Sequence, residues 1–122
     1  MKVAVLGASP KEDRYANKVM LRLAEKGHEA IGINPALPAI PGFQVVKDLE
    51  DLPEGVHTLT MYVGPERSTP LGDSILAGGF QRVVFNPGTE NPALEQRLSE
   101  AGVEVLQACS LVMLSTGQWE PR

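Results

Sequence analysis

The sequence predicts an α/β fold, in which short buried strands alternate with amphipathic helices. Apolar runs rich in β-branched residues alternate along the chain with segments of helical period. Gly27, Gly78 and Gly102 follow the helical segments, at the position where a glycine commonly ends a helix. The chain has 122 residues, the length of one ordinary domain. We therefore expect residues 1–122 to form a single doubly wound, Rossmann-like domain with about five parallel strands.

The first half of the chain supplies two strands and a helix. Residues 2–6 form an apolar run that ends at Gly7 and predicts a buried strand. A helix over residues 15–26 follows, because its apolar residues recur on one helical face. Residues 29–33 predict the second strand. The next ten residues contain three prolines and predict a rigid loop.

The second half repeats the alternation. Residues 44–46 are a possible edge strand, and residues 48–53 a helical turn. The remaining elements are a strand at 57–63, a helix at 65–77, a strand at 82–85, a helix at 91–101 and a strand at 103–106. An apolar patch at 111–114 either covers the sheet or packs against a second copy, so a homodimer is possible.

Composition excludes several classes of protein. The formal net charge is −4 and no basic run occurs, which argues against binding to nucleic acid or to an anionic membrane. One cysteine and two histidines exclude a disulfide framework and make a dedicated metal site improbable. No apolar stretch reaches the roughly 20 residues needed to span a bilayer. With no signal-peptide pattern at residue 1, we expect a cytoplasmic protein.

The loop after the first strand predicts a phosphate site. Gly7 permits a sharp turn and a close approach of the backbone to a ligand, and Ala8 and Ser9 follow it. The start of the next helix offers free N–H groups to an anion, and Arg14 adds a guanidinium suited to phosphate. The loop lacks the three glycines of the dinucleotide fingerprint, since Ser9 and Glu12 stand at two of those positions.

Other strand ends meet at the same edge of a parallel sheet, where ligands bind in such folds. The second strand ends in Asn34 and Pro35 rather than in the acid that holds a ribose hydroxyl of NAD. We therefore expect the remaining ligand contacts from residues at or just after the carboxyl ends of three strands: Asn34, Pro35, Val63, Gly64, Pro65, Gly88 and Thr89.

No catalytic residue is predicted. His57 opens a strand at the end opposite the ligand edge, and His28 lies in a turn. The acidic residues between 48 and 54 are typical of a solvated loop. Cys109 follows the last strand, and a buried cysteine often only packs. A mixed disulfide between Cys109 and a thiol ligand is the less favoured alternative.

These residues together carry a resemblance to a known family. The Gly7-Ala8-Ser9 loop, Arg14, Gly27-His28, Ile33-Asn34-Pro35, the run from Asn86 to Asn91 and Cys109 follow in the order and spacing of the small single-domain CoA-binding proteins. That family is related to the CoA-binding domain of the succinyl-CoA synthetase alpha subunit. The resemblance implies a Rossmann-like fold that holds coenzyme A or an acyl-CoA. Succinyl-CoA synthetase is a ligase that also uses an active-site histidine and an ATP-grasp partner. Neither has a counterpart in this sequence, so the resemblance does not imply ligase activity.

The leading hypothesis is therefore non-catalytic binding of coenzyme A by a carrier, sensor or accessory module. A small NAD(P)-dependent or other nucleotide-dependent enzyme is the second hypothesis. A protein-interaction module with a vestigial crevice is the third, motivated by the apolar tail.

Overall fold

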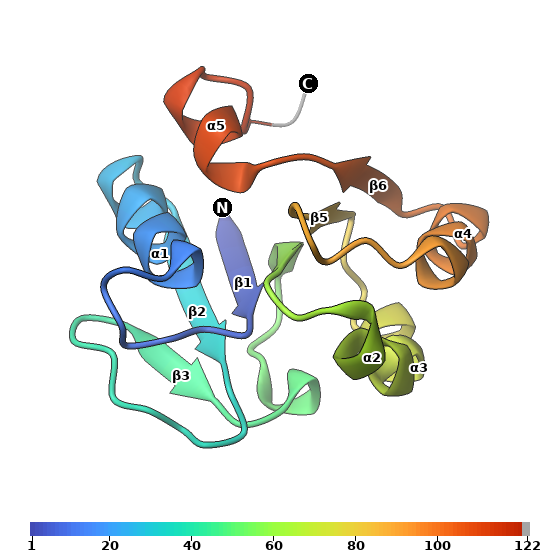
Figure 1. The fold of residues 1–122 in the computed structure, drawn as a ribbon, viewed down its shortest axis with the longest axis horizontal. Coiled ribbons are helices and arrows are strands. Elements are labelled where there is room, and N and C mark those ends of the chain that lie inside the picture. Colours follow the sequence, from blue (N-terminus) through green and yellow to red (C-terminus); the bar gives the residue numbers. More distant parts are fainter. Residues whose placement is uncertain (121–122) are drawn as a thin grey trace.

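Six parallel strands form one sheet in the order β3-β2-β1-β4-β5-β6 (Figure 1). This computed structural model describes residues 1–120. The strands are β1 (Lys2–Leu6), β2 (Glu29–Ile33), β3 (Gln44–Val46), β4 (Val56–Met61), β5 (Arg82–Phe85) and β6 (Glu104–Gln107). The α/β class and the parallel doubly wound sheet are confirmed. The sheet has one strand more than the expected five because the short edge segment β3 pairs with β2.

Helices cover both faces of this sheet, α1 and α5 on one face and α2, α3 and α4 on the other (Figure 1). They are α1 (Tyr15–Glu25), α2 (Pro65–Ser68), α3 (Gly72–Ala77), α4 (Pro92–Glu100) and α5 (Ser110–Ser115), with 3-10 turns η1 (Leu49–Asp51) and η2 (Thr69–Leu71). No helix within residues 1–120 is both long enough and apolar enough to cross a bilayer.

Alternation within each strand builds two hydrophobic cores. In β1, Val3 and Val5 face α1 and α5, whereas Ala4 and Leu6 face the opposite helices. All four side chains are buried. A central parallel strand has this pattern because successive side chains point to opposite faces and both faces are covered.

The helix expected over residues 65–77 is interrupted. It divides into α2, η2 and α3, with Pro70 inside the 3-10 turn. A proline has no N–H to donate and its ring collides with the preceding helical turn, which explains the interruption. The interruption leaves α2 as a short separate element directly after β4, at the carboxyl edge of the sheet.

The apolar tail packs within its own chain. Residues 110–115 form α5, and Met113, Leu114 and Trp119 are buried in the core that α1 covers. A buried polar network anchors α5 to the sheet. The Asn86 Nδ2 donates to Thr60 Oγ1 at 2.7 Å, and the Ser110 N–H donates to Asn86 Oδ1 at 2.8 Å. Of the two alternatives for the tail, this structure shows the one in which it covers the sheet.

The strand order reverses at β1. After β1 the chain forms β2 and β3 on one side, then crosses to β4, β5 and β6 on the other side. Loops that leave β1 and β4 therefore diverge at their carboxyl ends and leave a crevice between them. Open α/β sheets bind ligands at this type of switch point.

Candidate functional site

The loop after β1 is held tightly against the end of β2. The N–H groups of Gly7 and Ala8 both donate to the Ile33 carbonyl, at 3.0 and 3.3 Å. The Asn34 Nδ2 donates to the Ala8 carbonyl at 2.8 Å, and the buried Asn17 of α1 donates to the Ser9 carbonyl at 2.9 Å. Four hydrogen bonds thus join the loop to β2, Asn34 and α1, and the two N–H groups nearest β1 are already bonded to protein.

Both backbone conformation and packing require a glycine at position 7. Its φ is +92°, in the left-handed region that favours glycine. A Cβ on Gly7 would lie 2.9 Å from both the Tyr62 carbonyl oxygen and Val63 Cγ1. Gly7 therefore lies close to the chain that leaves β4, and its close approach to a ligand stays a prediction.

The start of α1 leaves backbone donors unused. Arg14 is the N-cap residue and provides no side-chain cap. Within residues 1–120, the N–H groups of Tyr15 and Ala16 have no hydrogen-bond acceptor. At α4, by contrast, the Asn91 Oδ1 accepts a hydrogen bond from the Leu94 N–H at 3.3 Å. An uncapped helix start of this kind attracts anions.

A cavity of about 360 Å³ lies against this helix start, and we call it the polar cavity. Its lining includes three cationic residues, Lys11, Arg14 and Arg67, and no carboxylate side chain. The full lining is Gly7, Ala8, Ser9, Lys11, Arg14, Tyr15, Ala16, Asn34, Tyr62 and Arg67. It brings together five residues predicted from the sequence, namely Gly7, Ala8, Ser9, Arg14 and Asn34. The chemistry suits a group with more than one negative charge.

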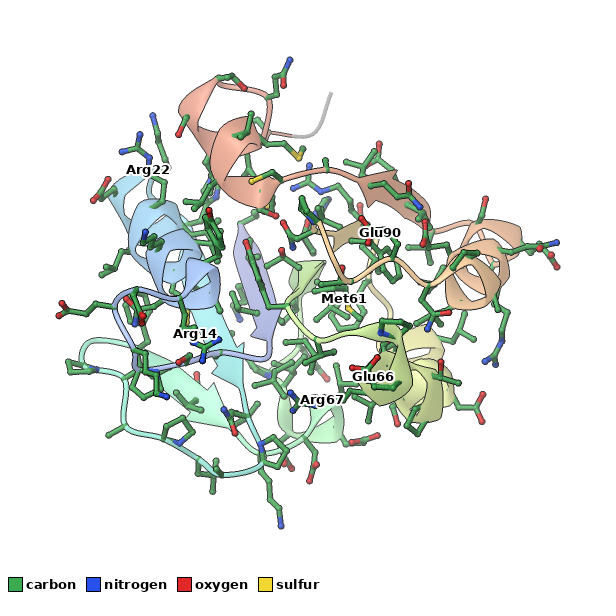
Figure 2. All side chains as sticks on the ribbon, in the orientation of Figure 1. Arg14, Arg22, Met61, Glu66, Arg67 and Glu90 are labelled. Atoms are coloured by element: carbon green, nitrogen blue, oxygen red, sulfur yellow. The ribbon has the colours of Figure 1, made fainter. Side chains whose placement is uncertain are left out.

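The arginines within residues 1–120 divide into two groups by their partners. Arg22 pairs with Glu25 at 3.0 Å, and Arg97 pairs with Asp73 at 2.7 Å. The buried Arg82 donates to the Trp119 carbonyl at 2.6 Å. Arg14 and Arg67, in contrast, have neither an ion pair nor a side-chain hydrogen bond to any residue from 1 to 120. Figure 2 shows these two arginines on either side of the carboxyl end of β1, with Arg22 at the far end of α1.

A second cavity of about 330 Å³ adjoins the first, and we call it the apolar cavity. Apolar side chains dominate its lining, which comprises Leu6, Gly7, Ile33, Pro35, Lys47, Asp48, Leu49, Glu50, Val63, Glu66, Arg67, Pro70 and Leu71. Pro35 and Val63 were predicted as ligand contacts. Only Gly7 and Arg67 line both this cavity and the polar cavity.

A third cavity of about 210 Å³ lies on the other side of the polar cavity, lined by Tyr15, Tyr62, Asn86, Pro87 and Cys109. Tyr15 and Tyr62 line both, so we call it the tyrosine cavity. Burial, with a smaller contribution from Cys109, raises the pKa of Tyr62 above its ordinary value. The Tyr62 hydroxyl is therefore protonated at neutral pH and can donate a hydrogen bond. The three cavities together follow the carboxyl edge of the sheet.

Four other residues predicted as ligand contacts lie in turns or at helix starts. Gly64 is the N-cap of α2, and Pro65 is its first residue. The Gly88 N–H donates to Glu90 Oε1 at 2.9 Å, and Thr89 Oγ1 donates to the Asn86 carbonyl at 2.8 Å. All four lie at the same edge of the sheet, but none lines the three cavities.

Both histidines lie at the amino end of the sheet, away from these cavities. His57 is the second residue of β4, where burial and the nearby charge of Arg82 lower its pKa. His28 precedes β2, and its Nε2 lies 2.8 Å from Glu120 Oε1. Within residues 1–120, no cluster of three or more His, Cys, Asp or Glu side chains could hold a metal ion.

Four residues at the site were not predicted from the sequence, namely Lys11, Arg67, Tyr62 and Asn17. A signal for Arg67 was present, since it lies in the first turn of the helix after β4, as Arg14 lies at the first turn after β1. The signal is weak because a cation at a helix start is also common on solvated surfaces. Only the packing of α2 beside the β1 loop brings Arg67 to the polar cavity.

Comparison with known proteins agrees with the resemblance seen in the sequence. Residues 1–115 match the family model described as "CoA binding domain". The ADP-forming acetate–CoA ligase I of Archaeoglobus fulgidus is 29% identical over 93% of this chain. This chain spans only 18% of the length of that ligase.

Solved structures show the same fold in proteins of similar size. The crystal structure of an uncharacterised protein is 40% identical, with a TM-score of 0.90 over 96% of each chain. A hypothetical protein from Pyrococcus horikoshii is 26% identical, with a TM-score of 0.86 over 93% of this chain and 81% of its own. From the family match over residues 1–115 and these similarities, the chain belongs to the CoA binding domain family.

Proposed function

We propose that residues 1–122 form a module that binds coenzyme A or an acyl-CoA at the carboxyl edge of the sheet, without catalysing a reaction. A carrier, a sensor or an accessory subunit would need this activity. One observation carries the proposal. The two arginines without a protein partner in residues 1–120 line one cavity together with the uncapped start of α1. Coenzyme A carries the diphosphate that such a cavity suits.

The three cavities match the three chemical parts of coenzyme A. The diphosphate would lie in the polar cavity, near Arg14 and the N–H groups of Tyr15 and Ala16. Adenine, a flat aromatic ring whose faces can pack on apolar side chains, would occupy the apolar cavity beside Pro35 and Val63. The pantetheine arm would then extend past Tyr15 and Tyr62 into the tyrosine cavity, which places its thiol or acyl end on the side of Cys109.

The position of the histidines supports a binding role rather than an enzymatic one. Histidine is the side chain that enzymes use most often as a general acid or base. His28 and His57 lie at the opposite end of the strands from the cavities. The side chain of Asn34 holds the Ala8 carbonyl, where an NAD-binding site would present an acid to the ribose.

A melting scan tests the ligand class. We expect coenzyme A to raise the midpoint more than NAD, NADP or ATP do at matched concentration. A ligand at 100 times its dissociation constant adds about 2.7 kcal/mol, a shift on the order of 10 °C for this size of domain. A shift with NAD and none with coenzyme A would favour a nucleotide-dependent enzyme. No shift with any of these ligands at saturating concentration would favour the interaction module.

Calorimetric titration tests the site itself. Arg14→Ala should weaken coenzyme A binding by about 1.5–3 kcal/mol, the range for a hydrogen bond to a charged group. Arg22→Ala is the matched control, because Arg22 lies on the same helix and pairs with Glu25 instead. Equal affinities for the two variants would show that the phosphates bind elsewhere.

A further inference from the structure

Arg67 occupies the junction between two cavities. It is one of the two residues that line both the apolar and the polar cavity, and the other, Gly7, has no side chain. The Arg67 side chain is exposed and has no ion pair within residues 1–120. It is therefore the one side chain that a ligand passing between these cavities must meet.

The acidic neighbour of Arg67 is directed elsewhere. Glu66 lines the apolar cavity but not the polar cavity. A Cβ built on Gly64 would lie 2.7 Å from Glu66 Oε1, so this carboxylate folds back over the start of α2. Arg67 consequently keeps its charge available to a ligand instead of neutralising Glu66. Figure 2 shows Arg67 on the side of α2 that faces the end of β1.

The position of Arg67 distinguishes two classes of ligand. A molecule that contains adenosine diphosphate occupies the apolar cavity with its base and the polar cavity with its phosphates, and so crosses the junction. A molecule such as 4′-phosphopantetheine has one phosphate and no base. It can fill the polar and tyrosine cavities beside Arg14 without reaching the junction. An arginine at the junction suits the first class, because its planar guanidinium can bind the phosphate nearest the nucleoside and also stack on the adenine ring.

We propose that Arg67 is a specificity-determining residue, which selects thiol ligands that carry adenosine diphosphate over ligands that end at a single phosphate. This inference rests on the proposed binding of coenzyme A. It assigns Arg14 and Arg67 different tasks: Arg14 contributes to both ligand classes, whereas Arg67 contributes only to the class that crosses the junction.

The test is calorimetric titration of the full chain with coenzyme A, dephospho-CoA and 4′-phosphopantetheine. Arg67→Ala should weaken binding of the first two by about tenfold or more and leave 4′-phosphopantetheine within about twofold of its original affinity. Arg67→Lys should restore part of the loss, since the charge returns without the bidentate geometry. Arg22→Ala serves as the control and should match the original protein for all three ligands.

Two results would overturn the inference and leave coenzyme A binding intact. One is unchanged affinity of Arg67→Ala for coenzyme A. The other is an equal loss for all three ligands, which would mean that Arg67 contributes only general positive charge. If the original protein bound none of the three, the proposed function would fail and the role of Arg67 with it. The melting point without ligand should be the same for Arg67→Ala, because Arg67 is exposed and has no partner to lose within residues 1–120.

Discussion

Gly7 illustrates how one residue serves both the fold and the site. Its left-handed backbone turns the chain out of β1, its N–H holds the Ile33 carbonyl, and its missing side chain leaves room for Tyr62 and Val63. A substitution at this position therefore changes the fold before it changes any ligand contact. Loss of binding alone cannot identify Gly7 as a phosphate ligand.

Gly7→Ala should lower the free energy of unfolding by more than Gly102→Ala does. Both glycines have positive φ, +92° and +86°, so both variants incur strain of about 1–3 kcal/mol. Only at Gly7 would the added Cβ also meet backbone, since nothing lies within 4 Å of the corresponding position at Gly102. Urea unfolding of the two variants measures the difference. Equal losses would contradict the packing role given to Gly7.

Asn34 shows why a strand-end position does not identify a ligand contact by itself. Its Nδ2 donates to the Ala8 carbonyl, and its Oδ1 accepts from the Ala36 N–H at 2.9 Å. The side chain therefore shapes two loops at the edge of the polar cavity. A contact between Asn34 and the nucleotide stays a prediction. The second N–H of the Asn34 amide could make this contact.

At the scale of secondary-structure elements, the docking of α5 depends on a few buried hydrogen bonds. Asn86 is 2% exposed and joins β4, β5 and α5 through Thr60, the Met61 carbonyl and the Ser110 N–H. A buried amide with satisfied partners fixes one arrangement of its neighbours, because each alternative leaves polar groups unpaired. The position of Cys109 beside the tyrosine cavity follows from this docking.

Asn86→Ala should lower the free energy of unfolding by roughly 2–4 kcal/mol, because Thr60 and the Ser110 N–H lose a buried partner. Trp119, which follows α5 and is the only tryptophan, should shift its fluorescence to longer wavelength as its surroundings loosen. Gln107→Ala is the control, since it removes only an exposed hydrogen bond to Glu95. Losses of the same size in both variants would show that the network does not anchor α5.

At the scale of the whole molecule, charge is distributed unevenly. The chain has a formal net charge of −4, yet three cations and no carboxylate side chain line the polar cavity. A cavity of this kind attracts an anion by local field, although the protein as a whole repels it. A phosphate ligand is therefore compatible with an acidic protein, and the expected absence of a nucleic-acid partner stays a prediction.

Salt should weaken coenzyme A binding. Lys11, Arg14 and Arg67 are exposed, so added salt screens their attraction for the diphosphate. We expect the dissociation constant to rise several-fold between 50 mM and 500 mM sodium chloride in calorimetric titrations. An affinity independent of salt would contradict the electrostatic role of the three cations.

The homodimer and the cytoplasmic location expected from the sequence stay predictions at this scale.

Local sequence patterns were enough to predict the alternation of strands and helices and the loop that meets the polar cavity. These are local properties, because a helical period, a β-branched run and a glycine stop are each visible within a short segment. The expected helix over residues 65–77 shows the limit of such patterns, since Pro70 divides it where the periodicity continues.

The order of the strands, and which residues from different strand ends meet, could be seen only in the folded structure. Arg14 and Arg67 belong to different βα connections, and they share a cavity because β1 and β4 are neighbours at the point where the strand order reverses. The apolar tail could have covered the sheet or a second copy, and the polar network around Asn86 favours the sheet of its own chain. Neighbour relations of this kind depend on long-range packing, which no local pattern in the sequence records.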